Sequence, residues 1–130
     1  MWVCLNRAFL SIVETTIPDP KGRLLVRARV KGDIERVFPK ARVKETPNRD
    51  YRFRSLIPRK IIASVMAEEV MNIDYCNFKS SVREGDRHDA YLRCWSAMNA
   101  LQRSRLFPSP SAGAEFLPWD EWDEGSFMRR

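Results

Sequence analysis

The chain has 130 residues, of which 44% are hydrophobic, and its formal net charge is +6 at pH 7. This length suits one domain with a single core, and no apolar run reaches the roughly 18 residues that a membrane-spanning helix needs. Three widely spaced cysteines and a single histidine argue against a disulfide framework and against a zinc site. We therefore expect a cytoplasmic protein with reduced, half-buried thiols, no metal and no cofactor.

The first third of the chain predicts short strands. Trp2–Leu5 and Ala8–Val13 are rich in aromatic and β-branched residues, and the two residues between them suit a tight turn. Proline and glycine make residues 15–22 a loop. A third strand is expected at Leu24–Val30.

The middle of the chain predicts a short helix and a hairpin. Ile34, Val37 and Phe38 recur at i, i+3 and i+4, and Asp33 is expected to cap this helix at its start. Arg42–Glu45 and Tyr51–Ile57 then flank a five-residue link with the composition of a hairpin turn, so both are expected to be strands.

Helices are expected in the rest of the domain. Pro58 suits the first position of a helix, and the apolar stripe of that helix is Ile61, Ile62, Val65, Met66, Val70 and Met71. Asp74 is expected to cap a shorter helix at Tyr75–Val82. The last helix begins near Gly85 and runs to about Leu101.

This order of elements predicts the α+β class. We expect an antiparallel sheet of about five strands with helices on one face, formed by residues 1–106. Residues 107–130 are expected to be a linker and a C-terminal tail.

Basic residues are concentrated in the first 60 residues. Residues 1–60 contain 15 Lys/Arg and 6 Asp/Glu, whereas residues 61–130 contain 8 and 11. Strand alternation places Tyr51 with Phe53 on the core face and four arginines on the open face. These arginines are Arg27, Arg29, Arg52 and Arg54.

Three interpretations of these arginines remain open. They suit phosphate contacts with single-stranded nucleic acid, or bidentate contacts with an acidic protein surface. Alternatively they pair with Glu14, Glu45 and nearby backbone and only keep the sheet soluble. Lys79 lies in the dense segment Asp74–Val82, which is either a partner contact or a core anchor.

No enzymatic activity is expected. The sequence contains no G-x-S-x-G, no G-x-x-x-x-G-K-[ST] and no H-E-x-x-H motif. His88, the one histidine, is expected to be a surface residue in the first turn of the last helix.

Four segments together resemble a family of small, largely uncharacterised proteins of bacteria and their phages. They are L-V-R-A-R at Leu25–Arg29, D-Y-x-F-R at Asp50–Arg54, I-D-Y-x-N-F-K at Ile73–Lys79 and Y-x-x-x-W at Tyr91–Trp95. The resemblance covers roughly residues 1–102 and implies a fold rather than a reaction. By analogy it suggests an inhibitor of a host defence that targets nucleic acids, of the anti-CRISPR kind.

The tail combines tryptophans with carboxylates. Its core is Trp119, Asp120, Glu121, Trp122, Asp123 and Glu124. Such a segment suits docking on arginines, either of its own sheet or of a partner. The leading hypothesis is thus a non-enzymatic protein that binds a protein or nucleoprotein partner, and the alternative is a single-stranded nucleic-acid-binding protein. The oligomeric state is left open.

Overall fold

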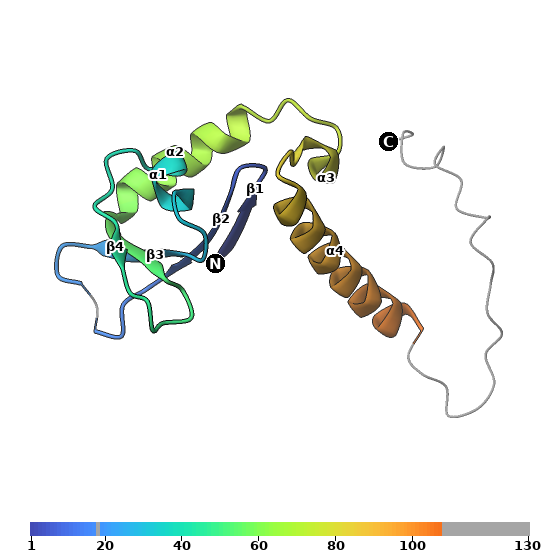
Figure 1. Ribbon diagram of the computed structural model, residues 1–130, viewed down its shortest axis with the longest axis horizontal. Helices are drawn as coiled ribbons and strands as arrows, with labels where there is room; N and C mark the ends of the chain where they lie inside the picture. The colour runs from blue at the N-terminus through green and yellow to red at the C-terminus, as the bar shows by residue number, and fades with distance from the viewer. Residues whose placement is uncertain (18, 108–130) are drawn as a thin grey trace. The chain divides into compact units, whose positions relative to one another are not determined.

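The computed structural model describes residues 1–17 and 19–107. In these residues the chain forms an antiparallel sheet and a set of helices (Figure 1). The strands are β1 (Trp2–Leu5), β2 (Ala8–Val13), β3 (Arg23–Ala28), β4 (Lys44–Glu45) and β5 (Phe53–Pro58). The helices are α1 (Asp33–Val37), α2 (Arg59–Met71), α3 (Phe78–Ser81) and α4 (Gly85–Leu106). The chain divides into two units, Met1–Cys94 and Trp95–Arg130, and the whole sheet belongs to the first.

The sheet is antiparallel throughout, with strand order β1-β2-β3-β5-β4. The predicted α+β class and the number of strands are therefore confirmed. The β1–β2 hairpin turns through two residues, as the sequence indicates. β4 is shorter than the predicted Arg42–Glu45, and the Arg42 carbonyl outside it accepts a hydrogen bond from the Ser55 hydroxyl (2.9 Å).

The hydrophobic core lies between one face of the sheet and helices α1 and α2. Strand alternation sends Val26 and Ala28 of β3 to the same face as Phe53 and Ile57 of β5, as predicted. The buried cluster is Ala8, Leu10, Ile12, Val26, Ala28, Ile34, Val37, Phe38, Phe53, Ile57 and Ile62. We call the opposite side of the sheet the open face.

Helix α1 starts differently from the prediction. Gly32, with φ +91°, is the residue before the helix, and no side chain caps it. This left-handed conformation favours glycine, which has no Cβ to clash with the backbone. Asp33 is the first helical residue rather than the cap, because its carboxylate binds groups from β2 and α4.

Helix α2 buries less of its apolar stripe than predicted. Ile62 is buried and Val65 and Met66 are half-buried, whereas Val70 and Met71 are 66% and 83% exposed. The sheet therefore covers only the first part of the helix. Pro58 is the last residue of β5 and precedes the helix, so it is not the first helical residue.

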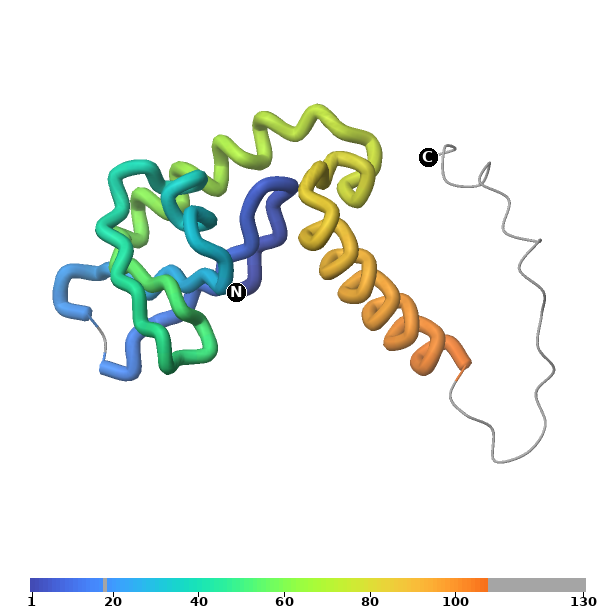
Figure 2. The backbone as a smooth tube through the Cα atoms, in the orientation of Figure 1, coloured from blue at the N-terminus to red at the C-terminus, as the bar shows by residue number. Residues whose placement is uncertain are grey.

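The remaining helices also correct details of the prediction. Figure 2 traces the chain from α2 through residues 72–77 into α3. Asn77, not Asp74, caps α3, with its Oδ1 accepting from Ser80 N at 3.3 Å. α4 continues past Leu101 to Leu106. The three cysteines are exposed rather than half-buried. No helix in the described ranges is long and apolar enough to span a membrane.

Candidate functional site

The outer edge of β1 presents unpaired backbone groups. Met1 N donates to Ile12 O (2.7 Å) and Ile12 N donates to Met1 O (2.8 Å), so these two residues form a hydrogen-bonded pair. Such pairs alternate with non-hydrogen-bonded pairs along an antiparallel ladder. By the β1–β2 register, the backbone N–H and C=O groups of Trp2 and Cys4 then point away from β2. Because β1 ends the sheet, no strand of the described residues pairs with them.

An apolar groove lies beside this edge, and we call it the β1 groove. Its volume is about 500 Å³. Val3 and Leu5 of β1 line one wall, and the exposed second half of α2 lines the other with the residues that follow it. The apolar and aromatic lining residues from this second wall are Met66, Val70, Ile73 and Tyr75.

Polar contacts hold the turn of the hairpin near α2. Arg7 in the β1–β2 turn forms a bidentate ion pair with Glu69 of α2, in which Nη1 and Oε2 lie 3.0 Å apart. Both residues line the β1 groove. The pair therefore bridges the two walls at this end.

The arginines of the open face have different partners. Arg29 forms an ion pair with Asp50, and Arg52 forms one with Glu45 (2.7 Å). Arg27 donates instead to the Ser11 hydroxyl (2.9 Å) and Arg54 to the Tyr51 carbonyl (3.0 Å). The structure thus brings Arg27, Arg29 and Arg54 together around residues 50–51, while Arg52 is bound to the edge strand.

Tyr51 was predicted to point into the core with Phe53. It is buried, being only 5% exposed, but it lies outside the core cluster and stacks with these arginines instead. The guanidinium carbons of Arg27 and Arg29 lie 4.4 and 4.1 Å from the centre of its ring. Tyr51 precedes β5, so strand alternation does not govern its side chain. The hydrogen bond from Arg29, together with the nearby charges of Arg27 and Arg54, lowers the pKa of Asp50.

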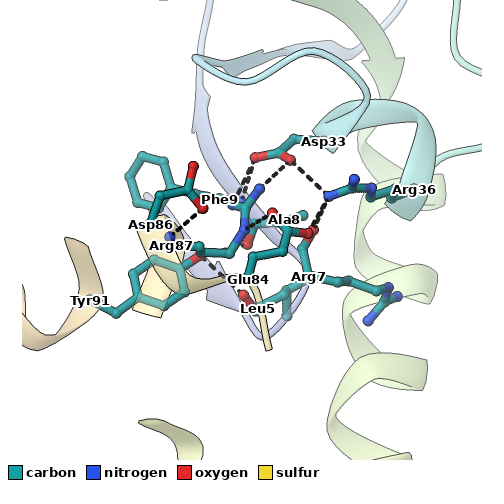
Figure 3. Close-up of polar contacts among 10 residues, drawn as sticks. All are labelled: Leu5, Arg7, Ala8, Phe9, Asp33, Arg36, Glu84, Asp86, Arg87 and Tyr91. Atoms are coloured by element: carbon teal, nitrogen blue, oxygen red, sulfur yellow. Dashed lines mark hydrogen bonds and ion pairs between the residues drawn. The ribbon is translucent and has the colours of Figure 1, made fainter. Parts of the chain in front are cut away.

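A buried network joins α1, α4 and the β1–β2 hairpin (Figure 3). The Asp33 carboxylate accepts from Arg87 Nη1 (3.0 Å) and Nη2 (2.7 Å), and also from Phe9 N (3.0 Å). Arg87 Nε donates to Glu84 (3.1 Å). The Tyr91 hydroxyl lies within hydrogen-bond distance of two hairpin carbonyls, those of Leu5 (3.0 Å) and Ala8 (2.9 Å), which share its single proton.

This network connects α1, α4 and the hairpin through groups that solvent hardly reaches. Asp33 and Arg87 are almost inaccessible to solvent and neutralise each other. Burial of the Tyr91 hydroxyl raises its pKa to about 12. The network fixes the start of α4 against the hairpin, and so it also fixes the position of β1.

The other predicted site residues lie elsewhere or cannot be placed. Lys79 belongs to α3, outside the sheet. The tail residues 119–124 lie outside the described residues. The parts of the chain that the structure describes contain no cluster of ligands able to hold a metal ion.

The β1 groove was not predicted from the sequence. No signal in the sequence indicated it, because the apolar stripe of α2 predicts burial along the whole helix. No protein-family model, curated protein or solved structure matches the chain.

Proposed function

We propose that this protein is a non-enzymatic binding protein, and that the β1 groove receives an extended segment of a partner protein. The observation that carries this proposal is the unpaired edge of β1 next to an apolar groove. Addition of a strand to a sheet edge takes its affinity from main-chain hydrogen bonds and its specificity from pockets for alternate side chains.

The geometry defines what the partner segment needs. The Trp2 and Cys4 backbone groups supply two donors and two acceptors. Side chains at every second position of an added strand point to the face that Val3 and Leu5 share. The segment should therefore be extended and carry apolar residues at alternate positions, which then pack against α2 and Ile73.

Selection of peptides from a random display library by the full chain tests this function. We expect enriched peptides to have apolar residues at alternate positions. Their affinity should fall at least tenfold for Val70→Glu, which places a carboxylate in the groove. Met71→Glu is the matched control, because Met71 is the next residue on the helix but does not line the groove. Enriched peptides that bind both variants equally well would contradict the proposal.

Inhibition of a host defence is the particular binding role that the sequence resemblance supports. A cytoplasmic inhibitor of the anti-CRISPR kind would occupy a protein or nucleoprotein complex without catalysing a reaction. Plaque counts in cells with an active CRISPR system, with and without expression of this chain, test that role. The Val70→Glu variant should lose any protection of the phage if the β1 groove mediates it, and unchanged plaque counts on expression of the native chain would contradict the role.

A further inference from the structure

A continuous row of side chains crosses the open face from one edge of the sheet to the other. Directly opposed residues of an antiparallel pair point to the same face. The four register pairs Trp2↔Ser11, Ser11↔Arg27, Arg27↔Arg54 and Lys44↔Arg54 connect all five strands. The cross-strand row is therefore Trp2, Ser11, Arg27, Arg54 and Lys44.

The three cations of this row form no direct ion pair within the described residues, although Arg27 and Arg54 lie near enough to Asp50 to lower its pKa. Arg27, Arg54 and Lys44 form no ion pair with a described carboxylate, and the two arginines are held by a hydroxyl and a carbonyl. By contrast, the nearby Arg29 is paired with Asp50. Neutral acceptors fix the direction of a guanidinium without cancelling its charge, so the row keeps a positive potential.

The other end of the row carries an aromatic platform. Trp2 is 67% exposed. Its ring packs edge-on against Phe9, with the centroids 5.6 Å apart and the planes at 75°. Phe9 faces Cys4 in the register and so lies on the same side as Trp2. The contact holds the indole in place and leaves part of its surface to solvent.

We infer that a single-stranded nucleic acid binds along the cross-strand row, with a base stacked on Trp2 and phosphates at Arg27, Arg54 and Lys44. At about 4.8 Å between neighbouring strands the row is about 19 Å long, enough for a few nucleotides. A cationic track beside an exposed aromatic side chain is the arrangement that binds single strands without reading their sequence. A duplex cannot stack a base on Trp2, because its bases are already stacked on one another.

This site and the peptide site share Trp2 through different groups: the Trp2 side chain belongs to the row, and the Trp2 backbone lies on the free edge of β1. Failure of the nucleic-acid site would leave the proposed function intact. The side chains of the row point to the open face, and no residue of the row lines the groove, to which β1 contributes Val3, Cys4 and Leu5. Val70→Glu should therefore leave binding of nucleic acid unchanged.

Fluorescence anisotropy with labelled oligo-dT and oligo-rU of about 12 nucleotides tests the inference on the full chain. Three phosphate contacts predict a slope of about −2 for log affinity against log salt, or about a twentyfold loss between about 50 and about 200 mM salt. The double variant Lys44→Gln/Arg54→Gln should reduce that slope to about −0.7. Trp2→Ala should weaken binding at least about fivefold through loss of stacking.

Two control variants make the result decisive. Arg52→Gln removes an exposed arginine that is already paired with Glu45 and should leave the affinity unchanged. The second variant converts the tail carboxylates to amides through Glu115→Gln, Asp120→Asn, Glu121→Gln, Asp123→Asn and Glu124→Gln. If only this variant binds, and the Lys44 and Arg54 substitutions abolish its binding, the row is a nucleic-acid site that the tail occupies in the native chain.

Three results would overturn the inference. The first is no binding by either the native chain or the tail variant. The second is an equal loss of affinity for Arg52→Gln and for Lys44→Gln/Arg54→Gln, which would indicate a diffuse charge effect. The third is binding of labelled poly-glutamate, but not of the oligonucleotides, through Lys44 and Arg54, because the open face would then be a site for an acidic protein.

Discussion

Removal of the Asp33 carboxylate should destabilise the fold far more than removal of a surface acid. Asp33 is fully buried, and its partner Arg87 has a side chain only 5% exposed. In Asp33→Ala, Arg87 keeps its contact with Glu84 but loses both terminal hydrogen bonds, and Phe9 N–H loses its acceptor. Breaking a buried ion pair on one side costs about 3–5 kcal/mol, a large part of the roughly 5–15 kcal/mol that stabilises a domain.

Urea unfolding followed by far-UV circular dichroism measures this cost. At a typical slope of about 2 kcal/mol per molar, a loss of about 4 kcal/mol lowers the midpoint by about 2 M. Glu45→Ala is the matched control, because Glu45 and its partner Arg52 are both about half exposed. Such surface pairs contribute about 0–1 kcal/mol.

A double variant separates the buried charge from the other effects of the substitution. Asp33→Asn/Arg87→Met keeps an acceptor for Phe9 N–H and removes both charges, so its stability should lie within about 2 kcal/mol of the native value. Equal costs for Asp33→Ala and Glu45→Ala would refute the reasoning. So would a double variant as unstable as the sum of its two single variants.

Three further results are expected. Hydrogen exchange should show fast amides at Trp2 and Cys4 and slow ones at the other two residues of β1, and uniform protection along β1 would contradict a free edge. The pKa of Asp50, measured by NMR, should lie below that of an ordinary aspartate and should return toward it in Arg29→Gln. Because folding lowers this pKa, the stabilisation by ionised Asp50 is present above the unfolded pKa and is lost as the pH falls through the folded pKa. Folding raises the pKa of Tyr91 to about 12. The free energy of unfolding should therefore decrease as the pH rises from about 10, the ordinary tyrosine pKa, toward about 12. In Tyr91→Phe, the decrease that is due to Tyr91 should disappear.

Local sequence patterns determined the type and order of the elements near the N-terminus. β-branched and aromatic residues interrupted by a two-residue turn define the first hairpin within the chain itself, and the predicted bounds of β1 and β2 agree with the structure. Strand alternation also placed Arg27 and Arg54 on the open face of the sheet. With the other face buried, only one register keeps these charged side chains in solvent.

Tertiary contacts decided the features that local rules cannot reach. Asp33 is of a residue type that often caps helices, but Arg87, a buried arginine 54 residues later in the chain, binds its carboxylate. Strand alternation assigns Tyr51 to the core face, but Arg27 of β3 and Arg29, which follows β3, stack on its ring. In both cases a long-range electrostatic partner outweighed a weak local preference.

The sequence by itself determined the α+β class, the amphipathic pattern of the strands and the presence of arginines on the open face. Only the tertiary structure decided which apolar side chains remain uncovered and which backbone groups remain unpaired. The apolar stripe of α2 implied burial along the whole helix, yet the sheet ends before its last turns and leaves Val70 beside the free edge of β1. Likewise the register alone aligns Trp2, Arg27, Arg54 and Lys44 in one row. The pairing of strands distant in sequence depends on how the whole core packs, and no single segment of the chain encodes it.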